Sequence, residues 1–254
     1  MQLSEYIRAR RKNARVLLMT HIVVGYPNLQ RSRELVDAMV AAGVDLIELQ
    51  IPFSEPMADG PVILKANQIA LKNGTKVADC FEFARDASKR HATPFLFMTY
   101  YNILHRLGLS TFAERSRDAG IQGVIVPDCP FEEGGPSRRA LSAQGVAPIQ
   151  LFSPKTPDER LRQLGDVAGG LVYVVTRKGV TGSTTAFSAE MNAYLGRCRE
   201  ATSLPLAAGF GITSKSDVDF LVGKVDIAVV GSQALRIFDD AGVSDVSEFL
   251  GSLR

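Results

Sequence analysis

One pattern recurs along this chain and limits the folds it can adopt: a helix-like stretch ends in a small residue and a glycine, and a short apolar run follows. Residues 42–48, 119–126 and 222–230 are three copies of this pattern. Glycine ends a helix readily because it enters the left-handed region of backbone conformation without strain. The apolar runs are rich in Val and Ile and do not alternate with polar residues, which is typical of strands buried on both faces. Such strands, alternating with helices, predict a parallel sheet.

Eight strands of this kind are predicted, with helices between them. In one expected helix, Leu35, Val36, Met39 and Val40 fall on a single face. No G-x-G-x-x-G motif follows the first strand, so a closed barrel is favoured over an open dinucleotide-binding sheet. We predict an α/β fold, a single TIM (β/α)8 barrel domain over residues 1–254 with an additional N-terminal helix. The expected strands are residues 16–20, 46–50, 95–99, 124–126, 149–152, 171–175, 206–208 and 227–230, and the expected helices are 29–42, 63–73, 80–90, 111–119, 137–143, 158–164, 188–202, 214–222 and 244–253.

Size, charge and cysteine content exclude several classes of protein. The chain has 254 residues, the usual size of one such barrel. Its 29 basic and 27 acidic side chains give a net charge of +2, which predicts neither nucleic acid nor an anionic membrane as a partner. No apolar stretch approaches the ~20 residues of a membrane span, and residues 1–15 contain no apolar signal core. Cys80, Cys129 and Cys198 lack metal-ligand spacing and suit a reducing compartment, so we predict a cytoplasmic protein without a metal.

Two carboxylates near the end of the second predicted strand are candidate acid–base residues, because barrel active sites lie at the carboxyl ends of the strands. Alternation places Ile47 and Leu49 on the face covered by helices and Glu48 on the inner face. A carboxylate there is costly unless it is paired, hydrogen-bonded or protonated. Position alone does not distinguish a catalytic Glu48 from one tied to a nearby arginine or backbone amide. Asp59, in the following loop, is either a second catalytic carboxylate or the N-cap of a helix expected near Pro61.

Glycines after the last three strands are candidates for a phosphate cradle. They lie within residues 176–182, 208–212 and 230–232, and Ser232 adds a hydroxyl donor. In this fold phosphate often binds after strands seven and eight, where free backbone amides and the dipole of a short extra helix favour an anion. Each motif alone is also compatible with ordinary turn glycines. The three together predict a phosphorylated small-molecule substrate.

The three histidines do not cluster in the sequence. His21 lies near the end of the first predicted strand, where its side chain can face the pocket. Position alone favours ordinary surface or hydrogen-bonded histidines for His21, His91 and His105.

Several of these motifs together resemble one known family. Residues 48–61, with the sequence ELQIPFSEPMADGP, are similar to the signature of the tryptophan synthase α chain. Residues 126–133, 176–182, 208–212 and 230–232 match further blocks of that family in the same order. The matching blocks extend over most of the chain, so the set is highly specific.

The resemblance implies a lyase that cleaves indole-3-glycerol phosphate to indole and glyceraldehyde 3-phosphate in the last step of tryptophan biosynthesis. It implies that Glu48 protonates indole C3 and helps to take the proton from the glycerol hydroxyl, and that Asp59 accepts a hydrogen bond from the indole N–H. It implies no cofactor in this chain, a β subunit that carries pyridoxal phosphate, and an α2β2 tetramer. The matching substrate-binding positions are Tyr100, Tyr173, Phe210, Gly182, Gly211, Gly231 and Ser232.

The chemistry of this reaction suits two carboxylates in different environments. Releasing indole by breaking a carbon–carbon bond requires a proton at C3 and a stabilised positive charge on the ring nitrogen. One carboxyl must therefore donate a proton while the other stays ionised. Asp59, on what we expect to be a wetter loop, is the candidate for the ionised group.

The chain departs from the family pattern at several positions. Gln50 replaces the usual glycine, Glu55 the usual aspartate, residues 23–24 a Thr-Ala or similar pair, and His21 a commonly apolar or aromatic residue. The loop with Glu55 also contacts the β subunit in this family. We therefore expect these changes to affect signalling between the subunits more than the chemistry. Three alternatives stay open: a stand-alone lyase that releases free indole, a non-catalytic activator of a β subunit that binds a phosphate ligand, and another phosphate-binding barrel enzyme such as a sugar-phosphate isomerase.

Overall fold

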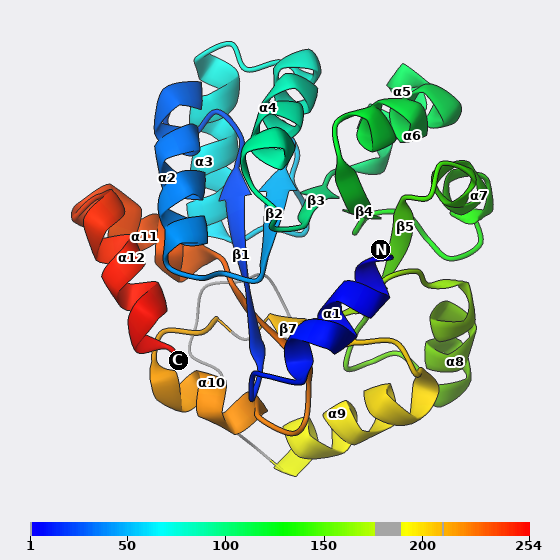
Figure 1. Ribbon diagram of the computed structural model, residues 1–254. Helices are drawn as coiled ribbons and strands as arrows, with labels where there is room; N and C mark the ends of the chain where they lie inside the picture. The colour runs from blue at the N-terminus through cyan, green and yellow to red at the C-terminus, as the bar shows by residue number, and fades with distance from the viewer. Residues whose placement is uncertain (1, 176–188, 210) are drawn as a thin grey trace.

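The strands form a closed parallel barrel in the computed structural model, which describes residues 2–175, 189–209 and 211–254. Each strand pairs with the next along the chain, and β8 pairs with β1. Figure 1 shows the helices arranged around the outside of these strands. The described elements are α1 (Leu3–Arg11), β1 (Leu17–Val23), α2 (Leu29–Ala41), β2 (Leu46–Gln50), α3 (Pro61–Lys72), α4 (Val77–Arg90), β3 (Phe95–Met98), α5 (Tyr101–Leu107), α6 (Leu109–Asp118), β4 (Ile121–Ile125), α7 (Gly135–Ala143), β5 (Ala147–Phe152), α8 (Asp158–Val167), β6 (Val172–Val175), α9 (Ala189–Ala201), β7 (Leu206–Gly209), α10 (Lys215–Leu221), β8 (Ile227–Val230), α11 (Ser232–Asp240) and α12 (Val243–Ser252).

The predicted barrel and its N-terminal helix are therefore confirmed, and the differences lie in detail. The short helix α5 was not predicted, because its seven residues precede Gly108 and are too few to show a helical period. Strand β4 begins at Ile121, earlier than predicted, because Gly123 pairs with Leu96 despite lacking an apolar side chain. Residue 188, the expected start of the helix that corresponds to α9, lies outside the described residues.

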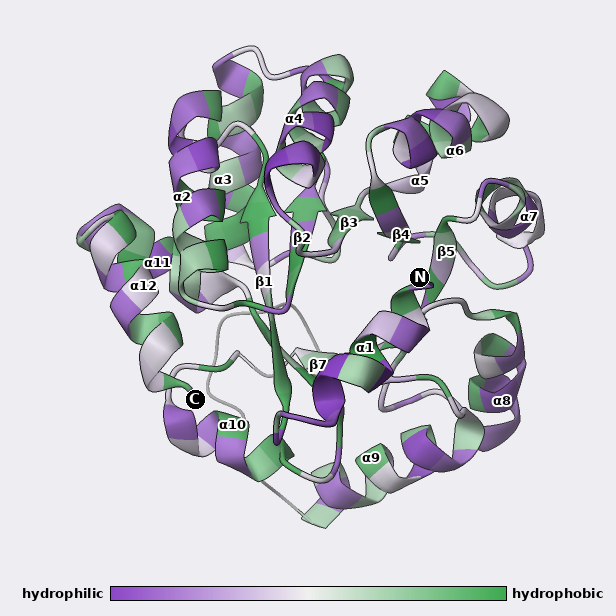
Figure 2. Cartoon of the chain, in the orientation of Figure 1, coloured by the Kyte–Doolittle hydropathy of each residue, from purple (hydrophilic) through white to green (hydrophobic). Residues whose placement is uncertain are grey.

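Alternation along the strands separates two apolar layers. One buried cluster contains every second strand residue, including Leu17, Met19, Leu46 and Leu96, and fills the barrel interior. Helix α1 adds Leu3 and Ile7 to that inner cluster, so it closes the end of the barrel opposite the carboxyl ends of the strands. The remaining strand residues pack in a larger cluster against the helices. Figure 2 shows hydrophobic residues concentrated on the strands and hydrophilic residues on the outer sides of the helices.

A buried carboxylate ties both ends of the chain to the amino end of β2. Asp45 is 1% exposed and accepts hydrogen bonds from the Leu18 amide at 3.0 Å and from Arg10 Nη2 at 2.8 Å. Arg254 Nη2 donates at 3.0 Å to Oδ2, the oxygen that also accepts from the Leu18 amide. This ion pair network holds α1 and the C-terminal residue against the barrel.

Replacing Asp45 with asparagine is expected to lower the free energy of unfolding by about 2 kcal/mol, because two guanidinium groups lose their anionic partner. A urea titration measures this change. The matched control is Asp37→Asn, which removes an exposed carboxylate that pairs with Arg90 and His91 and should cost less than about 1 kcal/mol. Equal losses in the two variants would contradict the anchoring role of Asp45.

Among the described residues, no helix combines the length and the hydropathy needed to cross a membrane. The same residues contain no group of three or more His, Cys, Asp and Glu side chains that could hold a metal ion.

Candidate active site

Glu48 projects from β2 into the mouth of the barrel. Its neighbours Ile47 and Leu49 are fully buried in the outer cluster against the helices, whereas Leu46 belongs to the inner cluster. Glu48 and Gln50, at even positions like Leu46, therefore face inward. The Glu48 side chain is almost fully buried, with the residue 2% exposed. This is the orientation that alternation predicts, and it places a carboxylate in the position where barrel enzymes carry out their chemistry.

The partner of Glu48 is a histidine rather than an arginine or a backbone amide. His21 Nδ1 lies 3.0 Å from Glu48 Oε1, and the two residues are paired directly in the β1–β2 register. Burial lowers the pKa of His21, but the negative charge of Glu48 and the hydrogen bond to it outweigh burial and raise the pKa above its usual value. His21 is thus a buried, hydrogen-bonded histidine inside the site, which its position in the sequence did not establish.

Asp59 is folded back over the barrel mouth by two hydrogen bonds to the same oxygen. Gln50 Nε2 donates to Asp59 Oδ2 at 2.6 Å, and the Tyr100 hydroxyl donates to it at 3.1 Å. Asp59 is not the N-cap of α3, because Gly60 occupies that position. Asp59 is only partly buried and its loop is largely exposed, so it is the wetter of the two carboxylates, as predicted. Burial nevertheless raises the pKa of Asp59, while the hydrogen bonds from Gln50 and Tyr100 act in the opposite direction.

Several hydrogen bonds and a ring contact hold the loop that carries Asp59, and none of them was predicted from the sequence. Asn67, fully buried in α3, accepts a hydrogen bond from the Phe53 amide at 2.9 Å and a longer one from Gln50 Nε2 at 3.4 Å. The Phe53 ring stacks on Tyr100 with their centroids 5.0 Å apart. The Tyr100 hydroxyl also accepts from the Ala58 amide at 3.2 Å. Gln50, a departure from the family pattern, is therefore a structural part of the site.

Tyr173 lies close enough to both carboxylates for their charges to act on its hydroxyl. Its pKa is raised well above the usual value, chiefly by burial and then by the negative charges of Glu48 and Asp59. The hydroxyl lies over β7, where a methyl group added to Gly209 would come within 3.3 Å of it. A glycine at this position therefore gives the tyrosine the room it needs.

The predicted phosphate cradle is described only in part. Gly231 is the N-cap of α11 and Ser232 is the first residue of that helix, which is an additional helix between β8 and α12. Gly211 has a φ of +64°, a conformation that favours glycine. Gly182, Phe210 and the rest of residues 176–182 belong to the part of the chain outside the described residues. The candidate site therefore brings together Glu48, Asp59, Tyr100 and Tyr173, with the described cradle residues at the ends of β7 and β8.

Replacing Tyr100 with phenylalanine tests whether Asp59 acts as an anion. The variant removes a hydrogen bond that lowers the pKa of Asp59, so that pKa should rise further. An ionised Asp59 is lost as the pH falls through its pKa, so the acid limb of kcat/KM should move to higher pH. The pH profile of kcat/KM measures this shift, and an unmoved acid limb would count against an ionised Asp59.

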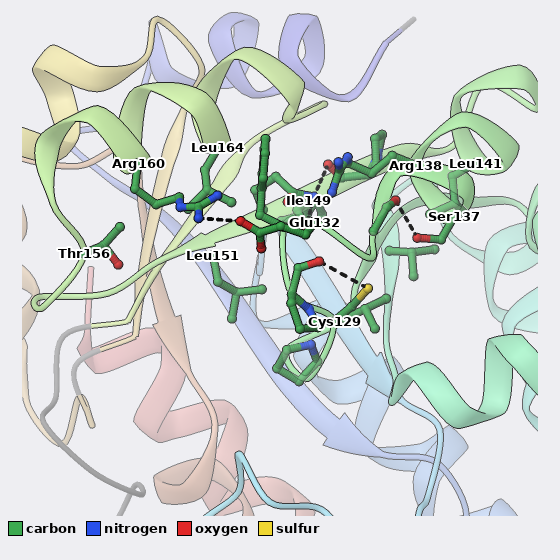
Figure 3. A pocket seen from close by; sticks show the side chains of 18 residues that line it. Cys129, Glu132, Ser137, Arg138, Leu141, Ile149, Leu151, Thr156, Arg160 and Leu164 are labelled. Atoms are coloured by element: carbon green, nitrogen blue, oxygen red, sulfur yellow. Dashed lines mark hydrogen bonds and ion pairs between the residues drawn. The ribbon is translucent and has the colours of Figure 1, made fainter.

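A second cavity, of about 350 Å³, lies outside the barrel between α7 and α8 and beside β4 and β5. Figure 3 shows Arg160 and Glu132 directed toward one another across it, with Cys129 nearby. The Phe131 ring lies between two guanidinium groups, those of Arg138 and Arg160, each 4.9 Å from its centroid. None of the candidate catalytic residues lines this cavity, and burial raises the pKa of the Cys129 thiol. Its features fasten the β4–α7 loop and do not resemble a reactive site.

Comparison with known proteins points to one family. The family model described as tryptophan synthase alpha chain matches residues 7–248. The tryptophan synthase alpha chain of Desulforapulum autotrophicum is 55% identical over 99% of each chain. The structure of Mycobacterium tuberculosis tryptophan synthase superposes with a TM-score of 0.92 at 29% identity, covering 99% of this chain and 96% of that one. A chain of the tryptophan synthase α2β2 complex of Pyrococcus furiosus, a structure titled for mutual activation, has a TM-score of 0.86 at 29% identity and covers 93% of this chain and 97% of that one.

Proposed function

The chain belongs to the tryptophan synthase alpha chain family, and we propose that the chamber formed by Glu48, Asp59, Tyr100 and Tyr173 is its catalytic centre. The activity of the chain is the cleavage of indole-3-glycerol phosphate to indole and glyceraldehyde 3-phosphate in tryptophan biosynthesis. One observation carries the catalytic assignment: the position of Asp59 over the barrel mouth. Its Oδ2 accepts a hydrogen bond at 2.6 Å from Nε2 of Gln50, which follows the inward-facing Glu48 by two residues on β2. Residues 1–254 act as one barrel domain in this proposal.

Glu48 is the acid–base residue in this proposal. Protonation of indole C3 by Glu48 makes the ring an electron acceptor, so the bond between C3 and the glycerol carbon can break. The glycerol hydroxyl then becomes the aldehyde carbonyl, and its proton passes to Glu48, which restores the starting state. One carboxyl serves both transfers because they occur on neighbouring atoms of the substrate. A buried site supports this role because no bulk water competes for the proton.

Asp59 stabilises the charge that protonation creates. The indole N–H becomes more acidic as positive charge develops on the ring. Its hydrogen bond to a fixed carboxylate is therefore stronger in the transition state than in the ground state. Asp59 Oδ2 is occupied by Gln50 and Tyr100, so Oδ1 is the oxygen assigned to the indole N–H. Tyr100, Tyr173 and Phe210 are assigned to the walls around the substrate.

The phosphate group is assigned to the cradle at the ends of the last three strands. Gly231 and Ser232 provide the N-terminus of α11, and the dipole of that helix favours an anion. Gly211 and Gly182 complete the set that the family pattern matches. The chain itself needs no cofactor or metal for this chemistry, since proton transfer and charge stabilisation are supplied by its side chains.

We propose a β subunit with pyridoxal phosphate as the partner, in an α2β2 tetramer through which indole passes directly. The loop that carries Asp59 is suited to contact it, because Met57 on that loop is 74% exposed and Glu55 is exposed beside it. The free thiols of Cys80, Cys129 and Cys198 are consistent with a cytoplasmic location, which is also part of the proposal.

An assay of indole release from the purified chain, with and without a β subunit, tests the function. Release from indole-3-glycerol phosphate that increases strongly on adding the β subunit supports a coupled lyase. Equal rates in both conditions would indicate a stand-alone lyase. Activation of the β subunit without any cleavage would indicate a non-catalytic partner, and turnover of a sugar phosphate in place of indole release would indicate an isomerase.

A further inference from the structure

His21 is placed against Glu48 by the sheet itself. The two residues are direct partners in the parallel β1–β2 pair, and their side chains meet at 3.0 Å between Nδ1 and Oε1. His21 is 7% exposed, so the contact lies away from bulk water. On its other side, a methyl group added to Gly231 would lie 3.5 Å from the His21 Cβ, which leaves the imidazole beside the start of α11.

Each member of the pair keeps one buried polar atom without a partner. Within the described residues, three buried atoms of this site make no hydrogen bond of 3.5 Å or less: His21 Nε2, Glu48 Oε2 and Gln50 Oε1. Gln50 lies close enough to act on the pKa of His21, whereas Glu48 Oε2 has no such neighbour in the described part of the chain. Buried polar atoms are nearly always satisfied in folded proteins, so the orphaned Oε2 indicates a place where a polar ligand binds. Substrate is the ligand that this chamber is proposed to receive.

We propose that His21 is a positioning residue for Glu48, holding Oε1 so that Oε2 is the oxygen presented to substrate, and that the two side chains share a proton. This inference rests on the proposed function of Glu48. The hydrogen bond to Oε1 restricts rotation of the Glu48 carboxyl group. Oε2 is therefore left free to contact the substrate. The Nδ1–H stays in the hydrogen bond to Oε1. With His21 neutral and the shared proton on Oε2, Oε2 gives that proton to indole C3 and then takes the proton of the glycerol hydroxyl, which restores the starting state.

The groups around His21 favour a retained proton. Glu48 on β2 and Asp59 in the following loop are the negative charges that act on it, and Gln50 adds a polar contact. Tyr173 on β6 faces the same two carboxylates, and Gly231, the uncharged N-cap of α11, lies beside His21. Because these carboxylates raise the pKa of His21, the pair should lose its proton at a higher pH than a free imidazole does.

The test compares His21→Phe with His21→Asn in kcat, KM and pH profile, using the chain together with its β subunit. His21→Phe removes both the hydrogen bond and the titrating group, so kcat should fall about tenfold with little change in KM, and the alkaline limb of kcat/KM should move about one unit to lower pH. His21→Asn keeps a donor near the Nδ1 position, so it should restore most of the lost kcat while the alkaline limb stays shifted. The control is His91→Asn, which alters a histidine paired with Asp37 at the surface and should change neither quantity.

A native kcat and a native alkaline limb in His21→Phe would overturn the inference, and so would the absence of any rescue in His21→Asn. Titration of the imidazole signals by NMR gives a readout that does not depend on activity, and the chain has only three histidines to assign. The His21 pKa should lie above the usual value and should fall in Glu48→Gln. An unchanged His21 pKa in Glu48→Gln would show that the two side chains are not coupled. That result would overturn this inference even if Glu48 is essential for cleavage, so it is distinguishable from a failure of the proposed function.

Discussion

Replacing Glu48 with glutamine is expected to lower kcat for indole release by a factor of about 10²–10⁴, the usual contribution of a positioned acid–base group. Glutamine keeps the size of the side chain and can accept a hydrogen bond from His21, but it cannot give a proton to indole C3. Substrate binding should change little, because the lost interaction belongs to the transition state. Steady-state kinetics of indole release measure this effect.

The matched control for Glu48 is Glu55→Gln, which makes the same chemical change on an exposed loop position near the same site. The rate of cleavage by the chain alone should be close to that of the unmodified protein in this control. Circular dichroism and the urea midpoint establish that both variants keep the fold. A Glu48→Gln variant that is folded and fully active would remove Glu48 from the reaction.

Replacing Asp59 with asparagine is expected to lower kcat by a factor of about 10²–10³, because the developing positive charge on the indole ring loses its anionic partner. The amide oxygen of asparagine can still accept from Gln50 and Tyr100, so the loop should keep its position. The acid limb assigned to Asp59 should disappear from the pH profile as well. Kinetics across a range of pH values measure both effects.

Asp239→Asn is the control for this change. Like Asp59, Asp239 accepts a hydrogen bond from a tyrosine hydroxyl, that of Tyr26 at 2.6 Å, but it lies at the surface and also pairs with Lys65. A loss of rate in Asp239→Asn as large as that in Asp59→Asn would show that the effect is structural. A persistent acid limb in Asp59→Asn would assign that limb to another group.

The barrel and the inward orientation of Glu48 could be predicted from sequence because both depend on local patterns. Buried strands that alternate with helices leave few other arrangements, and the period of two along residues 46–50 decides which side chains face inward. The short helix α5 escaped prediction because seven residues give too little periodicity. Family resemblance, rather than pattern, supplied the roles of the aromatic and phosphate-binding positions.

The electrostatic environment of the site could not be predicted, because it depends on contacts between distant parts of the chain. The pairing of His21 with Glu48 follows from the β1–β2 register, which the sequence does not specify. The burial of Asp59 follows from hydrogen bonds to Gln50 and Tyr100, and the latter is 41 residues away. The exposure of this loop agrees with its two prolines and polar residues, whereas the partial burial that raises the pKa of Asp59 depends on partners that the sequence does not show.

A crystal structure of the chain with indole-3-glycerol phosphate or a stable analogue tests the central claim most directly. The indole ring should lie between Glu48 and Asp59, with its C3 facing Glu48 Oε2 and its N–H donating to Asp59, and the phosphate should meet Gly211, Gly231 and Ser232. An indole ring bound elsewhere, or a ring in the chamber whose N–H and C3 both lie beyond reach of the two carboxylates, would contradict it.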